Sequence, residues 1–353
     1  MRAFFAARPE LTPTPLRHLP GLAGDLGIGT LLAKDETARF GLNAFKLLGA
    51  RFAIETLLAE GDVQRGAMLA CASEGNHGRA VARAARDAGC SCRVYMAHDA
   101  APSRVEAIAG EGAEVIKVDG SYDDAVRIMD AEARANGWTI ISDTAWPGYE
   151  RIPRLIMLGY TRMLDEISNQ QSAIGNQDPV AGWDAIFVQG GVGGLLCAMA
   201  SWCAFHRREK PVRVITVEPT TAACLQASAR AGRPVAVTGA LDTTMAGLRN
   251  REVSPPAFAA LLPIVDAFIA IDDVWSDRAM RSLAKPRPGD PEIAAGASGS
   301  AALGGLFALC QEPALADARA KLGLDEKSRI LVIVSEGVTD PALWRARVGA
   351  SHR

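Results

Sequence analysis

The sequence has no excess of charge of either sign and no long hydrophobic run. Its 353 residues include 38 Lys plus Arg and 40 Asp plus Glu, which gives a formal net charge of -2. Without a basic block, the chain has no source for the electrostatic attraction that drives binding to nucleic acids or anionic membranes. Residues 1–9 hold only a short apolar stretch between arginines, shorter than a signal-peptide core or a membrane span. We therefore expect a mature N-terminal arm and a small-molecule partner, with neither a nucleic acid nor a membrane as partner.

The cysteines do not form a disulfide framework, and the common metal-binding patterns are missing. The seven cysteines are odd in number and irregularly spaced, which is typical of a reducing compartment. The chain contains no His-Glu-x-x-His sequence and no paired Cys-x-x-Cys sequences. We expect a cytoplasmic protein without a metal site.

Several nucleotide-binding and hydrolase motifs are also incomplete. The glycines at Gly191 and Gly193 would need a third glycine or alanine at position 196 for a dinucleotide fingerprint, but that residue is Leu196. No phosphate loop ending in Gly-Lys-Ser or Gly-Lys-Thr occurs. The segment 296–300 resembles a nucleophile elbow but ends in Ser300 where that motif has glycine. These failures disfavour a nicotinamide or flavin enzyme and a serine hydrolase.

From about residue 65, short runs rich in Val and Ile alternate with alanine-rich segments of helical period. This alternation predicts repeated strand–helix units around parallel sheets, arranged in two α/β lobes that bind the ligand at the carboxyl ends of strands. The predicted strands are 67–72, 93–96, 114–118, 139–142, 185–188, 213–217, 267–271 and 330–334.

Glycine, proline and polar residues indicate where helices end and where loops lie. Glycines at 89, 110, 137 and 232 lie where helices should stop, and Pro102 suits a first helical turn. The polar segment 169–182 predicts a surface loop, and the proline-containing segment 285–300 predicts a second irregular region.

Lysine is scarce, because only seven of the 38 basic residues are lysines. Asn43 is a suitable helix N-cap, which would place Lys46 in the first helical turn. The positive end of the helix dipole and burial would both lower the pKa of the Lys46 amine, as a Schiff-base lysine requires. The alternative is a Lys46 side chain that only extends along the helix surface.

Two further segments each follow a predicted strand and precede a predicted helix. They are Ser-Glu-Gly-Asn-His-Gly at 73–78 and Gly-Gly-Val-Gly-Gly at 190–194. Successive backbone N–H groups at a helix start suit an anion such as a carboxylate or a phosphate. A helix cap and a tight turn without ligand are the alternatives.

In this order, the motifs resemble the fold-type II pyridoxal-phosphate enzymes, a group that includes threonine dehydratase, cysteine synthase and the tryptophan synthase β chain. Within the group, the chain is most similar to the 2,3-diaminopropionate ammonia-lyase family, over nearly its whole length from about Thr14. The resemblance is carried by Lys-Asp-Glu-x-x-Arg-Phe-Gly-Leu-Asn-Ala-Phe-Lys at 34–46, Asp-Thr-Ala-Trp-x-Gly-Tyr at 143–149, Val-Glu-Pro at 217–219, Met-Ala-Gly-Leu at 245–248 and Ser-Glu-Gly-x-Thr-Asp at 335–340.

The resemblance implies two open, twisted, mostly parallel sheets flanked by helices, with the cofactor in the interdomain cleft. It implies a large cofactor-binding domain of residues 1–48 and 149–353, a small α/β domain of residues 49–148, and a homodimer.

It also implies the site residues. Lys46 would carry pyridoxal phosphate as a Schiff base, Asn76 would bind the pyridine hydroxyl oxygen, and Ser335 would meet the pyridine nitrogen. The phosphate would be held by the backbone N–H groups of Gly190, Gly191, Val192, Gly193 and Gly194. The substrate carboxylate would dock on the turn that contains Ser73, Gly75 and His77, and the two family carboxylates would be Glu74 and Asp143.

The reaction implied is α,β-elimination from a 2,3-diaminopropionate-like amino acid, which gives pyruvate and ammonia. The chain departs from the family at Glu74, where the family has aspartate. One added methylene moves the carboxylate by about 1.5 Å, and shifts near 1 Å can cost about two orders of magnitude in rate. The alternatives are therefore a dehydratase or lyase for a 3-hydroxy amino acid, a β-replacement enzyme, and a non-catalytic cofactor-binding protein.

Overall fold

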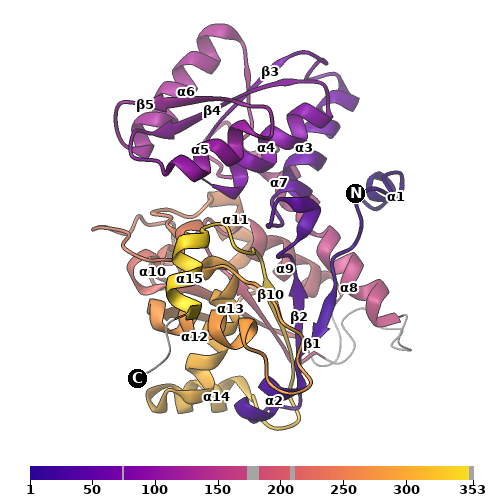
Figure 1. Cartoon of the computed structure of the whole chain (residues 1–353), viewed down its shortest axis with the longest axis vertical. Helices are drawn as coiled ribbons and strands as arrows, with labels where there is room; N and C mark the ends of the chain where they lie inside the picture. Colours follow the sequence, from indigo (N-terminus) through magenta and orange to yellow (C-terminus); the bar gives the residue numbers. More distant parts are fainter. Residues whose placement is uncertain (74, 173–182, 207–210, 350–353) are drawn as a thin grey trace. The chain divides into compact units, whose positions relative to one another are not determined.

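The computed structural model describes residues 1–73, 75–172, 183–206 and 211–349. The chain forms two compact units. Unit 1 comprises Met1–Glu10 and Phe45–Arg162, and unit 2 comprises Leu11–Ala44 and Met163–Arg353. Figure 1 shows strands flanked by helices in both units. No helix among the described residues is long and apolar enough to cross a bilayer.

Unit 1 contains a four-stranded parallel sheet with the strand order β5-β4-β3-β6. Its strands are β3 (Met68–Ala72), β4 (Ser91–Ala97), β5 (Glu114–Val118) and β6 (Thr139–Ile140). Its helices are α1 (Arg2–Ala6), α3 (Leu47–Glu60), α4 (Asn76–Asp87), α5 (Pro102–Ala109), α6 (Tyr122–Asn136) and α7 (Arg151–Tyr160).

Helices cover both faces of the unit 1 sheet, with α6 on one side and α4 and α5 on the other (Figure 1). Ala70 and Tyr95, on neighbouring strands, pack with Met129 of α6 in one apolar cluster. Helix α6 begins at a capping box, in which Ser121 accepts a hydrogen bond from the third residue of the helix. It ends at Gly137 in the left-handed conformation, as predicted.

Unit 2 contains a six-stranded sheet with the order β1-β2-β10-β7-β8-β9, in which only the edge strand β1 is antiparallel. Its strands are β1 (Leu16–His18), β2 (Thr30–Asp35), β7 (Ala185–Gln189), β8 (Arg213–Pro219), β9 (Ala267–Ile271) and β10 (Arg329–Val334). Its α-helices are α2 (Pro20–Leu26), α8 (Arg162–Ser172, which starts on the last residue of unit 1), α9 (Gly194–Phe205), α10 (Cys224–Ala231), α11 (Pro255–Leu261), α12 (Asp273–Ala284), α13 (Ala297–Gln311), α14 (Ala316–Leu322) and α15 (Pro341–Gly349). Its short 3-10 helices are η1 (Arg39–Gly41), η2 (Thr220–Ala222), η3 (Ala246–Leu248) and η4 (Pro313–Leu315).

Helix α13 lies at the centre of the unit 2 core. It is apolar on all sides, and this suits a helix that packs on the sheet with one side and on α12 with another. Phe187 and Val217 of the sheet belong to the same buried cluster as α13. Strand β7 is buried along its whole length, as expected for an interior strand with helices on both faces. The predicted class, two mostly parallel sheets flanked by helices, is confirmed.

The element predictions failed in three places. Strands β1 and β2 were not predicted, because both precede residue 65, where the recognised alternation begins, and Thr30–Asp35 contains two charged residues. The loop predicted from residue 169 begins later, since residues 169–172 continue α8, and residues 173–182 lie outside the described part of the chain. Helix α13 already begins at Ala297, inside the predicted irregular region 285–300.

The unit boundaries also differ from those predicted. The N-terminal arm belongs to unit 1, where Arg8 pairs with Glu55 and Phe4 contacts Phe52 at a ring-centroid distance of 5.0 Å. Helix α7 joins the same unit, because a glycine in each of α3 and α7 lets the two helices approach closely. A Cβ atom on Gly159 would lie 2.5 Å from the carbonyl oxygen of Leu48. Unit 1 therefore includes residues 1–10, 45–48 and 149–162, which the prediction placed in the large domain.

Candidate active site

Lys46 lies directly before the first residue of α3, at its N-cap position. The prediction that Asn43 caps this helix was wrong. Asn43 adopts a left-handed φ of 57°, and its carbonyl oxygen accepts a hydrogen bond from Gly337 N–H at 2.8 Å. The backbone up to Ala44 is therefore tied to the segment after β10, and helical conformation starts only at Lys46.

The Lys46 side chain is paired with Asp143. Its Nζ lies 2.5 Å from Asp143 Oδ2, and both side chains are largely buried. The rings of Phe45 and Tyr160 lie beside the amine, with centroids 5.3 and 5.9 Å from Nζ. The cation is therefore enclosed by one carboxylate and two aromatic side chains.

This pairing corrects the predicted protonation of Lys46. Burial lowers the pKa of the amine, but the charge of Asp143 and contacts with Asp143 and Tyr160 outweigh it and raise the pKa above its ordinary value. The prediction considered only the helix dipole and burial, because no sequence pattern shows that a carboxylate 97 residues away contacts Nζ. Burial raises the pKa of Asp143, but His77 and Lys46 outweigh it and hold this pKa well below its usual range.

A closed turn after β6 holds Asp143 in place. Ser142 N–H donates a hydrogen bond to the Tyr149 hydroxyl, which donates in turn to the Ile140 carbonyl, both at 2.8 Å. The rings of Trp146 and Tyr149 stack with centroids 4.1 Å apart. The Asp-Thr-Ala-Trp-x-Gly-Tyr sequence thus forms a compact structure that presents the carboxylate.

The turn between β3 and α4 has the predicted position. The Ser73 hydroxyl oxygen accepts hydrogen bonds from Gly78 N–H at 2.9 Å and from Gly75 N–H at 3.4 Å. Helix α4 then begins at Asn76, with Gly75 at its N-cap. Glu74, predicted as a catalytic carboxylate, lies outside the described residues.

The His77 ring is buried between this turn and the Asp143 turn. Its Nε2 lies 2.9 Å from the Ile141 carbonyl oxygen, and its Nδ1 lies 3.7 Å from Asp143 Oδ2. Burial lowers the pKa of His77, and Lys46 acts in the same direction while Asp143 opposes it. The ring is therefore mainly neutral at pH 7.

The glycine segment 190–194 connects β7 to α9 in unit 2. Gly191 and Gly193 have φ values of 64° and 93°, which favour glycine over residues with a side chain. The N–H groups of Gly191, Val192 and Gly194 donate no hydrogen bond to any described residue. They are available to an anion, as predicted for a phosphate-binding turn.

Two residues that were not predicted shape this turn. Glu218 accepts hydrogen bonds from Leu225 N–H and Gln226 N–H, each at 2.9 Å, and burial raises its pKa to about 7. A Cβ atom on Gly190 would lie 2.5 Å from Glu218 Cγ, so the buried glutamate requires glycine at that position. Gln189 donates from Nε2 to the Gly299 and Ile333 carbonyls, which fixes the end of β7 against α13 and β10.

Ser335 directly follows β10, as predicted. Its side chain is 5% exposed, and its hydroxyl makes no hydrogen bond to another described residue. The hydroxyl is therefore free to bind a ligand atom. Among the described residues, no group of three or more His, Cys, Asp or Glu side chains is arranged to hold a metal ion.

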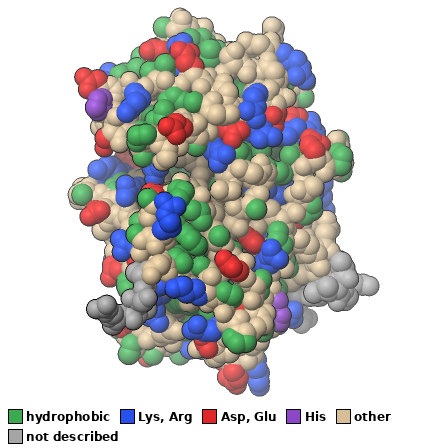
Figure 2. Space-filling model, in the orientation of Figure 1, with side chains coloured by type: hydrophobic (Ala, Val, Ile, Leu, Met, Phe, Trp, Pro, Cys, Tyr) green, Lys and Arg blue, Asp and Glu red, His purple; other side chains and the backbone are tan. Residues whose placement is uncertain are grey.

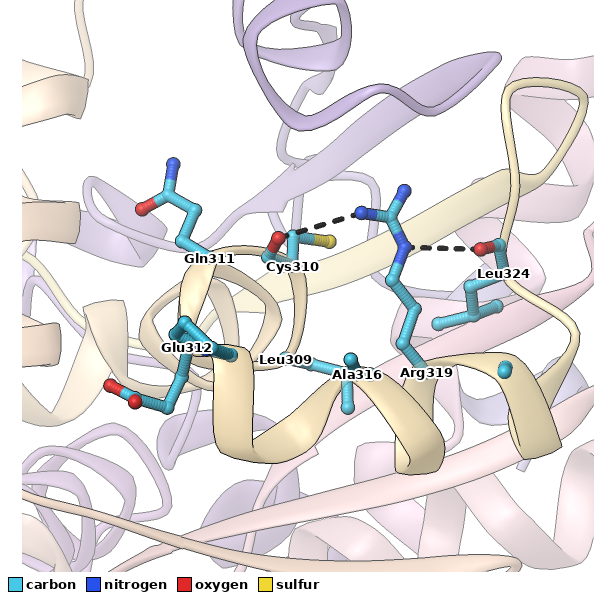
Figure 3. Close-up of a pocket in the computed structure, with 9 residues that line it drawn as sticks. Leu309, Cys310, Gln311, Glu312, Ala316, Arg319 and Leu324 are labelled. Atoms are coloured by element: carbon cyan, nitrogen blue, oxygen red, sulfur yellow. Dashed lines mark hydrogen bonds between the residues drawn. The ribbon is translucent and has the colours of Figure 1, made fainter.

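A hollow elsewhere in unit 2 contains none of these residues. Figure 3 shows that Arg319 reaches into this hollow and donates hydrogen bonds to the carbonyls of Cys310 and Leu324. Arg319 Nη2 also donates hydrogen bonds to the carbonyls of Leu26 and Gly27. The guanidinium is thus occupied by backbone groups.

The structure therefore places two groups of predicted residues. Unit 1 contains Lys46, Ser73, Gly75, Asn76, His77 and Asp143, and unit 2 contains Gly190, Gly191, Val192, Gly193, Gly194 and Ser335. Tyr160 was missed, because its approach to Lys46 depends on the close crossing of α3 and α7. The two helix-interior glycines, Gly49 and Gly159, were the only sequence signal for that crossing.

The available groups match the chemistry of pyridoxal phosphate. An enclosed lysine amine can form a Schiff base, free N–H groups at a helix start can hold a phosphate, and a free hydroxyl can face a ring nitrogen. The Cβ contact at Gly190 explains why this turn tolerates no side chain at its first position.

Comparisons with known proteins agree with this reading. Residues 7–336 match the family described as pyridoxal-phosphate dependent enzyme. The chain is 36% identical to diaminopropionate ammonia-lyase of Escherichia coli K12, over 94% of this chain and 86% of that protein. It is 35% identical to the Salmonella typhimurium enzyme of the same name, over 97% of this chain and 89% of that protein.

A solved structure extends the comparison to three dimensions. The crystal structure of the Escherichia coli enzyme in complex with an aminoacrylate-PLP azomethine reaction intermediate matches with a TM-score of 0.89. The sequence identity is 35%, and the match covers 98% of this chain and 90% of that chain. The resemblance found in the sequence is confirmed: the chain belongs to the pyridoxal-phosphate-dependent enzymes and, among them, to the diaminopropionate ammonia-lyase family.

Proposed function

We propose that the chain is a pyridoxal-phosphate-dependent ammonia-lyase that converts 2,3-diaminopropionate to pyruvate and ammonia by α,β-elimination. The observation that carries the proposal is the 2.5 Å contact between Lys46 Nζ and Asp143 Oδ2. This contact joins an enclosed lysine amine, as Schiff-base chemistry requires, to a buried carboxylate that can exchange a proton with it. Membership of the diaminopropionate ammonia-lyase family supports the choice of substrate.

The predicted site residues would hold the cofactor. Lys46 would bind its aldehyde carbon, Asn76 its hydroxyl oxygen and Ser335 its ring nitrogen. The N–H groups of the glycine segment 190–194 would hold its phosphate. Bound there, the cofactor supplies an electron sink that makes the α hydrogen of an amino acid acidic. The neutral Ser335 hydroxyl keeps this sink weaker than a carboxylate would, which suits elimination more than transamination.

The remaining residues would bind the substrate and move protons. The turn at Ser73, Gly75 and His77 would receive the substrate carboxylate through backbone N–H groups at the start of α4. Lys46 and Asp143 would accept and return protons on one side of the substrate, with Glu74 as the second carboxylate. A β-amino group leaves readily only when it is protonated, so one of these groups must act as an acid.

Glu74 favours a second candidate function. This position carries glutamate where the family carries aspartate, so its side chain is longer by one methylene group. A dehydratase or lyase acting on a 3-hydroxy amino acid would need a differently placed acid. We therefore expect the D-isomer of diaminopropionate to be the poorer substrate.

A substrate panel tests the proposal. The purified chain is incubated with D- and L-2,3-diaminopropionate, serine, threonine and 3-hydroxyaspartate, and both 2-oxo acid and ammonia are measured. Release of both products from diaminopropionate supports the lyase, and products from only the hydroxy amino acids would replace it with the dehydratase. Capture of an added thiol in a new amino acid, without pyruvate, would indicate β-replacement. Bound cofactor without a spectral change with any amino acid would indicate a non-catalytic protein.

The cofactor assignment has a separate test. The wild-type chain should be yellow with pyridoxal phosphate, and Lys46→Ala should lose this colour because the Schiff base cannot form. Lys285→Ala, at an exposed position outside the site, is the matched control and should stay yellow. A yellow Lys46→Ala variant with an unchanged absorbance maximum would contradict the assignment.

We further propose that the chain acts as a homodimer in the cytoplasm. Seven unpaired cysteines are consistent with a reducing compartment. On the face that Figure 2 shows, acidic and basic side chains are interspersed, without a large patch of either sign. Analytical ultracentrifugation tests the dimer, and a monomer at micromolar concentration would contradict it.

A further inference from the structure

The hydrogen positions on the His77 ring follow from its neighbours. Nε2 lies 2.9 Å from the Ile141 carbonyl oxygen, which can only accept a hydrogen bond. Nε2 must therefore carry the hydrogen, and in the neutral ring Nδ1 is left with its lone pair.

The Nδ1 lone pair is in an unfavourable place as long as it has no proton. Nδ1 is buried, and it has no hydrogen-bond partner among the described residues. It faces Asp143 Oδ2 at 3.7 Å, so two acceptors oppose each other in a medium of low polarity. A proton on Nδ1 would convert this contact into an ion pair.

Lys46 uses the same oxygen. Nζ is 2.5 Å from Asp143 Oδ2, so the Lys46 ammonium compensates the charge of the buried carboxylate. This compensation ends when the amine becomes neutral, as it must to attack a carbonyl carbon or to take a proton from a substrate. A buried carboxylate without a compensating cation is costly.

We infer that His77 is an alternate counter-ion of Asp143, which holds a proton on Nδ1 whenever Lys46 carries no positive charge. In the exchange, one N–H bond breaks at Lys46 Nζ and one forms at His77 Nδ1, through Asp143 Oδ2. The carboxylate is ionised before and after the exchange, and no electron is transferred. His77 is thus a positioning residue that acts through Asp143, and its role in turnover rests on the proposed function.

Other titratable groups near the three residues do not replace His77 in this role. Cys71 of β3 and the Tyr149 hydroxyl face Asp143, and the Tyr160 hydroxyl of α7 faces Lys46. Burial raises the pKa of each of these groups, so each is neutral at pH 7 and none becomes a cation on protonation. Among the described residues, only His77 can supply the second positive charge.

The test measures the charge of His77 directly in the full chain without cofactor. Ring nitrogens are labelled with ¹⁵N, and the His77 signals are identified among the five histidines by their loss in His77→Gln. In the wild type, we expect a neutral ring at pH 7 with hydrogen on Nε2. In Lys46→Met, the pKa of His77 should rise by about one to three pH units, because Asp143 then acts on it alone.

Matched variants separate this role from a structural one. Lys285→Met should leave the His77 titration unchanged, and Lys46→Met with Asp143→Asn should remove the rise. A wild-type ring with hydrogen on Nδ1, or an unchanged His77 pKa in a folded Lys46→Met chain, would overturn the inference. Failure of the proposed function would appear elsewhere, as a chain that binds no pyridoxal phosphate or releases no ammonia.

Discussion

At the scale of single residues, the protonation of Lys46 depends on one carboxylate. Asp143 holds the amine as an ammonium, whereas Schiff-base formation needs the neutral amine. The ion pair with Asp143 orients Lys46 Nζ, but it also keeps the amine in its unreactive, protonated form. The chain must therefore move a proton off Lys46 before the amine can react, and in the inferred exchange this proton passes through Asp143 to His77 Nδ1.

Asp143→Asn tests this balance. Because Asp143 raises the pKa of Lys46, its loss lowers that pKa, and Schiff-base formation should begin at a lower pH than in the wild type. The rate of colour formation with pyridoxal phosphate, measured against pH, reports the shift. Elimination should meanwhile fall by about 10²- to 10⁴-fold, because a positioned acid–base group is lost. An unshifted pH profile in a correctly folded variant would contradict the Lys46–Asp143 pairing.

Gly190→Ala tests the packing behind the glycine segment. The new Cβ would lie 2.5 Å from Glu218 Cγ, which should destabilise the fold by about 1–3 kcal/mol and weaken phosphate binding. Denaturant unfolding measures the first effect and pyridoxal phosphate titration the second. Gly24→Ala is the matched control, because no atom lies within 4 Å of the added Cβ on the exposed side of α2. Gly24→Ala should raise the free energy of unfolding by about 0.5–1 kcal/mol. An increase in this free energy in Gly190→Ala would contradict the packing argument.

At the scale of elements, a buried charge network joins β2, η1 and α8 within unit 2. Glu166 accepts hydrogen bonds from Lys34 Nζ at 2.7 Å and from Arg39 Nη2 at 2.8 Å. Arg39 Nε also donates to Glu36 at 2.6 Å, and all four side chains are 0–1% exposed. Two cations and two anions thus balance in the interior, and each needs the others to remain charged.

Glu166→Gln should destabilise the chain by about 3–5 kcal/mol, because it leaves Lys34 and Arg39 opposite a single carboxylate. Guanidinium unfolding at pH 7 measures the loss. Glu312→Gln, at an exposed position, is the control and should change stability by no more than about 0.5 kcal/mol. Equal stability of the two variants would show that the network contributes little.

The same network explains why β2 was not predicted. Two charged residues in a short segment, Lys34 and Asp35, predict a position at the protein surface. The strand nevertheless lies inside the sheet, between β1 and β10. The strand Ala267–Ile271 was predicted with its observed bounds, because its apolar pattern is local. Buried charge is recognisable only when its partner is known, and Glu166 is 132 residues away.

At the scale of the whole molecule, all seven cysteines are unpaired in the structure. The fold therefore depends on its apolar cores and on charge networks, without covalent cross-links. A thiol reductant should leave the thermal unfolding midpoint unchanged within about 1 °C, as measured by calorimetry. A decrease of several degrees would reveal a disulfide, since loss of one typically costs about 2–5 kcal/mol.

The division into units could be predicted only in outline. Alternating strands and helices indicate two α/β lobes from composition and period alone. The assignment of the N-terminal arm and α7 to unit 1 depends on the Arg8–Glu55 pair and on the close approach at Gly159, which have no local pattern.

The sequence by itself determined the strand–helix alternation, the family, the scarce lysine at position 46 and the glycine turn at 190–194. These features are local patterns, and steric and hydrogen-bonding rules act on them over a few residues. Only the tertiary structure decided that Asp143 raises the pKa of Lys46, that His77 presents an unprotonated nitrogen to Asp143, and that Glu218 requires glycine at position 190. Each of these depends on contacts between residues that are distant in the chain, where charge, burial and packing act together.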